Sequence, residues 1–402
     1  MRVGICAERS YHTCSLSAIR PARPRKAVCK RASGPSNADG TDRAESTDLP
    51  KSNPEDLSAT TIDGGETLTE TASLGGAGVL AVPLSGVVLP EGLDIQEQRK
   101  RLWFAAVKPP MYTVALIPIL VGTALAFATS GHFTASHFWT VIFASINIIA
   151  WLNVSNDVFD HDKDTDKGKA ESVVNLTGNR TACFWASFVF FVIGIGTFFQ
   201  LTSAAADDRI VKLLSTAIAM GYIYQGPPFR LSYKGLGEPL CFLAFGPLAT
   251  TAFYLAQYYR SIGSLAAITQ PVILAAVAVG ITTSVILFCS HFHQIEGDRA
   301  AGKISPLVRL GAARGLKVLR AACFSVYGLL ALGIGTGTLP WTSALVLLSL
   351  PMLKVFLQFA QETHLVPAQV WPLKRYAIKW HTLFGLTLAL GLAAPRWLGL
   401  SI

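Results

Sequence analysis

The stretch that decides the fold is 138–180, FWTVIFASINIIAWLNVSNDVFDHDKDTDKGKAESVVNLTGNR. Its first 15 residues are apolar enough to lie in a lipid bilayer. The acids that follow are Asp157, Asp160, Asp162, Asp164 and Asp166. A carboxylate at the end of an apolar helix costs free energy to desolvate unless it has a cationic partner. What these acids bind is therefore the first question that the sequence raises.

The composition of the whole chain favours a membrane protein. Of the 402 residues, 51% are hydrophobic and only 15% are charged. The net charge is +9, but the basic residues are scattered over short loops and form no stripe interleaved with aromatic residues, which argues against nucleic-acid binding. The 7 cysteines show no paired spacing, so we expect neither a disulfide framework nor a cysteine metal site.

The N-terminal residues differ from the rest of the chain. Residues 1–36 are rich in Arg, Lys and Ser, contain Glu8 as their only acid, and lack the apolar core of a secretory signal, which is typical of an organelle transit peptide. The residues that follow, up to about 75, are too polar to build a core. We expect a disordered linker over 37–95 and a membrane domain over 96–402.

Apolar windows long enough to cross a bilayer recur along the membrane domain. They predict an all-α bundle of about nine transmembrane helices, at 111–129, 137–155, 182–203, 209–225, 237–258, 271–291, 317–338, 342–360 and 381–398. Most Lys and Arg residues precede the first span or lie in the loops after every second span. This bias predicts that the N-terminal side of the bundle is the cytoplasm-like side. Both acid-bearing segments, 156–180 and 291–315, fall on that side.

The first acid cluster has a spacing that suits a metal site. If the second span continues to Asp164, then Asp157, Asp160 and Asp164 share one face of the helix. Stacked carboxylates repel one another unless a cation lies between them, and oxygen ligands together with substrate phosphates suit Mg²⁺. Asp166 joins this set only if the helix unwinds, which the following Lys-Gly-Lys allows.

The second acid segment is CSHFHQIEGDRAAGKISPLVRLG at 289–311, at the end of the sixth span. On a continued helix His291, Gln294 and Asp298 share a face, and Lys303 follows as a loop cation. Two acid-bearing helix ends with cations around them indicate a site for a metal-bridged diphosphate.

A third polar stretch on the same side is YIYQGPPFRLSYKGLGEP at 222–239. Arg230 and Lys234 are candidates for diphosphate contacts, and Tyr224 or Tyr233 for contact with an aromatic acceptor. Each of these residues alone is equally compatible with an ordinary interfacial position.

The pattern Asn-Asp-x-x-Asp-x-x-x-Asp at 156–164, together with the segment around Asp298, resembles the UbiA superfamily of intramembrane aromatic prenyltransferases. Four segments are similar to its naphthoate branch, which serves the phylloquinone and menaquinone pathways: NVSNDVFD at 153–160, KAESVVNLTG at 169–178, HFHQIEGDRAAGKISPLVRLG at 291–311 and AAVKPPMYTVALIPILVGTALA at 105–126. Homogentisate prenyltransferases and chlorophyll synthase share the first motif but usually follow it with Asn-Lys-Pro or Asn-Glu-Pro segments.

The resemblance implies a UbiA-type bundle with its active site at the stromal mouth of a multi-pass chloroplast membrane protein, residues 1–36 being the transit peptide. It implies Mg²⁺-dependent transfer of a phytyl group from phytyl diphosphate to 1,4-dihydroxy-2-naphthoate, or to its carboxynaphthoquinone form, with loss of CO₂. Another plastid acceptor, such as homogentisate, stays open as an alternative. An ion-coupled transporter is disfavoured, because the acids lie at span ends and not at the middle of broken helices.

The resemblance also implies roles for individual residues. The expected metal ligands are Asp157, Asp160, Asp164, Asp166 and Asp298. The expected substrate contacts are Asn153, Asn156, Lys108, Lys169, Arg180, Tyr224, Arg230, Lys234, Gln294 and Lys303. Family members of the Asp-x-x-x-Asp type have an acid where this chain has Gln294.

Overall fold

The computed structural model describes residues 94–161, 172–203 and 207–399. The chain divides into two units, Met1–Gly75 and Gly76–Ile402, and every described residue belongs to the second unit. The predicted transit peptide, 1–36, and nearly all of the predicted linker, 37–95, therefore lie outside the described residues.

The described residues form helices and connecting turns without a strand. Eight helices in the described ranges are long and apolar enough to cross a membrane: Gln96–Ser130, Ala135–His161, Arg180–Ser203, Gly237–Ile262, Gln270–Ala300, Ala312–Gly335, Trp341–Thr363 and Pro367–Trp397. The remaining predicted span, 209–225, corresponds to α6 (Asp208–Gln225), whose first turns carry Asp208, Arg209 and Lys212. The prediction of an all-α membrane bundle is confirmed.

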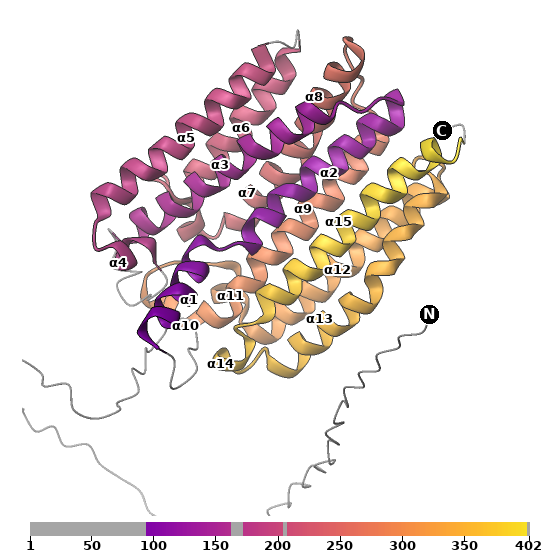
Figure 1. The fold of residues 1–402 in the computed structure, drawn as a ribbon. Helices are drawn as coiled ribbons and strands as arrows, with labels where there is room; N and C mark the ends of the chain where they lie inside the picture. Colours follow the sequence, from indigo (N-terminus) through magenta and orange to yellow (C-terminus); the bar gives the residue numbers. More distant parts are fainter. Residues whose placement is uncertain (1–93, 162–171, 204–206, 400–402) are drawn as a thin grey trace, which may run out of the picture. The chain divides into compact units, whose positions relative to one another are not determined.

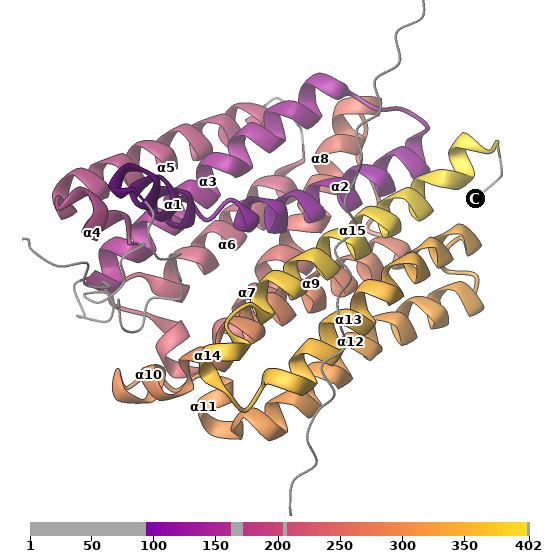
Figure 2. The ribbon, with the colours of Figure 1, turned by 60° about the horizontal axis from the view of Figure 1, so that its bottom comes forward.

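The helices that form the body of the bundle run roughly side by side (Figures 1 and 2). They comprise α2 (Pro110–Ser130), α3 (Ala135–His161), α5 (Arg180–Ser203), α6, α7 (Gly237–Leu243), α8 (Thr251–Ile262), α9 (Gln270–Ser290), α12 (Ala312–Gly335), α13 (Leu350–Thr363) and α15 (Leu373–Trp397). The first of these helices, α2, packs along the last, α15, and α9 contacts both of them. The core therefore lies around α2, α9 and α15.

Another set of elements gathers at one end of the bundle, as both ribbon views show for its α-helices. They are α1 (Ile95–Val107), α4 (Val173–Thr177), η1 (Leu231–Lys234), η3 (Phe292–Gln294), α10 (Ile295–Ala300), α11 (Pro306–Leu310) and α14 (Pro367–Val370). They belong to the segments that carry the predicted excess of Lys and Arg. We call this end the mouth of the bundle.

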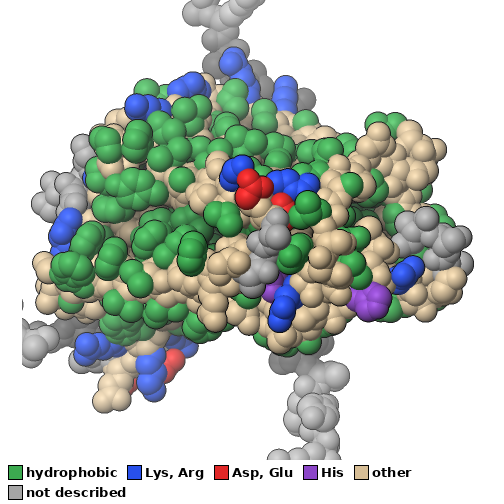
Figure 3. Space-filling view, turned by 90° about the horizontal axis from the view of Figure 1, so that it is seen from above, with side chains coloured by type: hydrophobic (Ala, Val, Ile, Leu, Met, Phe, Trp, Pro, Cys, Tyr) green, Lys and Arg blue, Asp and Glu red, His purple; other side chains and the backbone are tan. Residues whose placement is uncertain are grey.

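The outer helices present apolar surface. On α5, Trp185 and Phe199 are 59% and 68% exposed, and Phe188 and Val192 are exposed as well. Figure 3 shows one face of the molecule on which hydrophobic side chains cover a large area. Surface of this kind is stable only against lipid or another apolar partner.

The span from Gly237 to Ile262 contains a π-helical segment, η2 (Ala244–Thr250), between α7 and α8. Pro247 lies in this segment and lacks the N–H that a regular α-helical turn would use. The Thr250 hydroxyl donates a hydrogen bond to the Phe245 carbonyl at 2.9 Å, which satisfies an acceptor in the widened turn. The widened turn joins α7, which begins at the mouth, to α8.

The helices α2 and α8 approach closely at Gly122. A Cβ added there would lie 2.8 Å from both the Thr250 carbonyl oxygen and the Tyr254 backbone nitrogen. Backbones in a membrane approach this closely only where one helix has a small residue.

We expect Gly122→Ala to lower the thermal unfolding midpoint of the purified protein, because α2 and α8 must separate at a cost of about 1–3 kcal/mol. The matched control is Gly196→Ala on α5, where nothing lies within 4 Å of the added Cβ. The control should keep the wild-type midpoint or exceed it, since alanine favours helix. Equal midpoints for the two variants would contradict the close packing of α2 against α8.

Candidate active site

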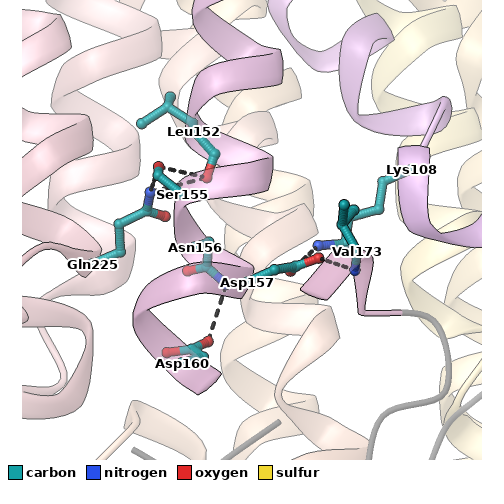
Figure 4. A network of polar contacts seen from close by, with 8 residues as sticks. All are labelled: Lys108, Leu152, Ser155, Asn156, Asp157, Asp160, Val173 and Gln225. Carbon is teal, nitrogen blue, oxygen red and sulfur yellow. Dashed lines mark hydrogen bonds and ion pairs between the residues drawn. The ribbon is translucent and has the colours of Figure 1, made fainter. Parts of the chain in front are cut away.

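The first acid motif lies at the mouth end of α3, and Asp157 is the more buried of its two described aspartates. The side chain of Asp157 is 4% exposed. Its Oδ1 accepts a hydrogen bond from Lys108 Nζ at 2.7 Å, and its Oδ2 accepts one from the Val173 backbone N–H at 3.0 Å (Figure 4). One carboxylate therefore ties the end of α1 and the start of α4 to α3.

Asp160 lies one turn further along α3 and accepts hydrogen bonds from two neutral donors. Asn156 Nδ2 donates to its Oδ2 at 3.0 Å, and the Tyr233 hydroxyl donates to its Oδ1 at 3.0 Å. Asn153, one turn before Asp157, lies beside the Tyr112 hydroxyl, and its buried Nδ2 forms no hydrogen bond of good geometry within the described chain. These contacts leave acceptor capacity on Asp160 and polar capacity on Asn153.

Three of the expected site residues, Asp164, Asp166 and Lys169, lie outside the described residues. Arg180 is the first residue of α5 and is exposed.

The second acid motif does not continue as a straight helix, which differs from the predicted shared face. The helix α9 ends at Ser290, the 3-10 turn η3 follows, and α10 then carries Asp298. His291 is buried, and its Nδ1 lies 3.0 Å from Glu238 Oε1 on α7, so it is paired with an acid that sequence reasoning did not select. Gln294, at the start of α10, is partly buried.

Asp298 is buried, with 7% of its surface exposed. Its Oδ1 lies 3.2 Å from Lys303 Nζ, and within the described ranges its Oδ2 has no hydrogen-bond partner. Glu296, two residues earlier, is exposed and pairs instead with Arg299 at 3.1 Å. The acids of this segment therefore differ: Asp298 keeps a desolvated oxygen for a cation, and Glu296 does not.

Two predicted cations occupy unusual backbone positions. Lys108 and Arg230 have φ values of 52° and 44°, and they are the two residues other than glycine with positive φ among those described. Such conformations cost free energy and persist where surrounding contacts impose them. Arg230 also has a buried guanidinium nitrogen without a hydrogen-bond partner in the described chain. Lys234 is exposed, and its carbonyl oxygen accepts a hydrogen bond from the Arg309 guanidinium at 2.9 Å.

Tyr233 connects the two acid motifs. Its hydroxyl donates to Asp160, and its carbonyl oxygen accepts a hydrogen bond from the Ile304 N–H at 2.8 Å, next to Lys303. Tyr224 also lies near both motifs, within range of the charges of Glu238, Asp160 and Asp298. The structure thus brings both acid-bearing helix ends and the third polar stretch to one place.

The described residues hold no group of three or more His, Cys, Asp or Glu side chains close enough together to bind a metal ion. The donors that they do offer are carboxylate oxygens, namely the free Oδ2 of Asp298 and the remaining acceptor positions of Asp160. A site with few protein oxygen donors suits Mg²⁺, which binds one or two carboxylates and takes the rest of its ligands from water and phosphate.

Comparison with known proteins gives related sequences over most of the chain. It is 45% identical over 300 residues to 2-carboxy-1,4-naphthoquinone phytyltransferase, chloroplastic, of Arabidopsis thaliana, covering 74% of this chain and 78% of the relative. It is 44% identical over 301 residues to 2-carboxy-1,4-naphthoquinone phytyltransferase of Synechocystis sp., covering 75% and 95%.

A solved structure shares the fold. The apo structure of a UbiA homologue from Aeropyrum pernix K1 superposes with a TM-score of 0.54 at 14% identity, covering 71% of this chain and 98% of that one. The sequence pattern of the UbiA prenyltransferase family matches residues 115–393, which include both acid motifs. The chain therefore belongs to the UbiA prenyltransferase family.

Proposed function

We propose that the protein transfers a phytyl group from phytyl diphosphate to 1,4-dihydroxy-2-naphthoate, or to its 2-carboxy-1,4-naphthoquinone form, with loss of CO₂, in phylloquinone synthesis. The observation that carries this proposal is the identity of 45% and 44% to two proteins named for that activity, over about three quarters of the chain. The paired acid motifs, joined through Tyr233, supply a site of the kind that a diphosphate requires.

Asp160 and Asp298 are the proposed Mg²⁺ ligands from the described residues, and Asp164 and Asp166 would complete the set. When bound, Mg²⁺ neutralises a diphosphate and stabilises it as a leaving group. Asp157 is also a carboxylate of this motif, but it is buried and already paired with the positive charge of Lys108 at 2.7 Å, whereas within the described chain Asp160 accepts hydrogen bonds from neutral donors alone. We assign to Asp157 and Lys108 the joint role of fixing the end of α3 beside the metal site.

The cations and amides around the acids would hold the diphosphate. Arg230 offers a buried donor with no partner in the described chain, and Lys303 already lies beside Asp298. Charged donors in a water-poor site stabilise developing negative charge more strongly than donors in water do. Asn153, Asn156, Lys169, Arg180, Lys234 and Gln294 are further proposed contacts, and Tyr224 is a proposed contact for the aromatic acceptor.

The proposed reaction breaks the allylic C–O bond of phytyl diphosphate, and the electron pair of that bond leaves with the diphosphate. The acceptor ring forms a new C–C bond at the allylic carbon. Its carboxylate then leaves as CO₂, and the electron pair of the lost C–C bond restores the aromatic ring. The apolar interior of the bundle would keep water from the allylic cation.

We place the protein in a chloroplast membrane with its mouth toward the stroma. This location rests on the composition of residues 1–36, on the chloroplastic relative in Arabidopsis thaliana, and on the excess of Lys and Arg at the mouth.

Membranes that contain the full chain should convert phytyl diphosphate and 1,4-dihydroxy-2-naphthoate to a decarboxylated phytyl product, measured by chromatography with mass spectrometry. EDTA should abolish this conversion and added Mg²⁺ should restore it, because the diphosphate needs a divalent partner. A parallel reaction should test the oxidised acceptor with and without a reductant. Phytyl transfer to homogentisate alone would show that the proposed acceptor is wrong. Phytyl transfer to neither acceptor would refute the proposal that the protein is a phytyltransferase.

Asp298→Asn should lower kcat/KM by about 10²-fold or more and raise the Mg²⁺ concentration needed for half-maximal rate, because it removes a charged oxygen at the reacting diphosphate. The matched control is Glu296→Gln. It also removes one negative charge from α10, but from an exposed side chain that lies two residues before Asp298. The control should keep wild-type kinetics. Similar losses in both variants would show that charge in α10, and not the Asp298 oxygen, matters.

Tyr233→Phe should lower kcat/KM by about 10–100-fold, because Asp160 loses the donor that orients it. The Mg²⁺ concentration needed for half-maximal rate should rise at the same time, which a purely structural defect would not cause. The matched control is Tyr222→Phe, whose hydroxyl donates to the Pro227 carbonyl and not to an acid. Unchanged metal dependence in Tyr233→Phe would count against the positioning role.

A further inference from the structure

A groove of about 800 Å³ runs between α12 and α13, and none of its lining residues belongs to the candidate active site. Its buried floor is made by Leu353 and Leu357, and its exposed walls include Phe324 and Leu350. The two helices that form the groove belong to spans with most of their surface outside the protein core. The groove therefore opens where the bilayer would be.

Two cations lie in this groove at the same depth. Arg320 comes eight residues after Ala312, where α12 begins at the mouth, and Lys354 comes nine residues before Thr363, where α13 returns to it. At 1.5 Å per residue, both lie about 12–14 Å from the helix ends. Charged groups at this depth of a membrane are costly unless they reach the interface or find a counter-charge.

Arg320 already extends toward the interface. Its guanidinium donates to Gln361 Oε1 at 2.8 Å, and Gln361 lies close to the mouth end of α13. Among the described residues neither Arg320 nor Lys354 forms a salt bridge. The nearby acid, Glu362, accepts a hydrogen bond from Gln358 at 2.9 Å instead. Two positive charges thus face a membrane groove without an opposing carboxylate.

We propose that this groove binds one acidic membrane lipid, with the anionic headgroup between Arg320 and Lys354 and an acyl chain along Phe324, Leu350 and Leu357. Basic pockets between transmembrane helices bind lipids of this kind, because they supply both the counter-charge and the apolar contact. The apolar floor favours a lipid over a soluble anion, which would gain nothing from Leu353 and Leu357. The site is separate from prenyl transfer and does not depend on the proposed function.

The test uses the full chain in nanodiscs of phosphatidylcholine mixed with phosphatidylglycerol, followed by native mass spectrometry. The wild-type protein should retain phosphatidylglycerol in preference to phosphatidylcholine. In the double variant Arg320→Gln with Lys354→Gln, the fraction of protein that retains phosphatidylglycerol should fall about tenfold or more. The matched control, Arg375→Gln with Lys379→Gln, removes two exposed charges at the mouth end of α15 and should behave as wild type.

Equal loss in both double variants, or equal retention of the two lipids by wild type, would overturn the proposal. So would displacement of phosphatidylglycerol by millimolar inorganic phosphate, which would point to a soluble anion. A second measurement needs no variant: phosphatidylglycerol with a photoreactive group in its acyl chain should label peptides of α12 and α13 in the wild-type protein. Labelling spread evenly over the exposed helices, α5 included, would also count against the site.

Discussion

The ion pair between Asp157 and Lys108 is the contact on which the mouth of the bundle depends. Asp157 is buried at the end of an apolar helix, and removing the lysine would leave an uncompensated charge at a cost of about 3–5 kcal/mol. The same carboxylate receives the Val173 N–H. A single buried charge thus determines where α1 and α4 meet α3, and hence how the adjoining Asp160 is presented.

The two acid motifs are built on a common plan. Each has a buried aspartate with a lysine beside it: Asp157 with Lys108, and Asp298 with Lys303. The charged groups are therefore fixed in place before any substrate arrives. Groups that are already oriented need not reorient when charge develops on the substrate, which lowers the free-energy cost of the reaction. The connection through Tyr233 lets the two halves of the site keep a constant separation.

Much of this arrangement could be predicted from the sequence, because the length of an apolar run decides whether a helix can span a bilayer. The distribution of Lys and Arg likewise predicted which helix ends share the mouth. The expected common face of His291 and Asp298 was wrong in its local geometry. Phe292, which is 1% exposed and packs edge-on against Phe288 at 5.7 Å, lies in a 3-10 turn that interrupts the helix. A spacing of four residues between two phenylalanines is also that of a continuous helix, so the sequence pattern does not reveal this turn. The pairs Tyr233–Asp160 and His291–Glu238 join residues 73 and 53 positions apart, beyond the reach of local pattern.

The packing of α2 along α15 has a consequence for biosynthesis. Along the chain α2 comes first among the bundle helices and α15 comes last, yet each covers an apolar side of the other. Until the C-terminal helix inserts, α2 contacts α3, α8, α9, η2 and the surrounding lipid. The bundle is therefore completed only when its C-terminal helix has inserted, so a chain cut short before α15 would leave one packed face of α2 uncovered.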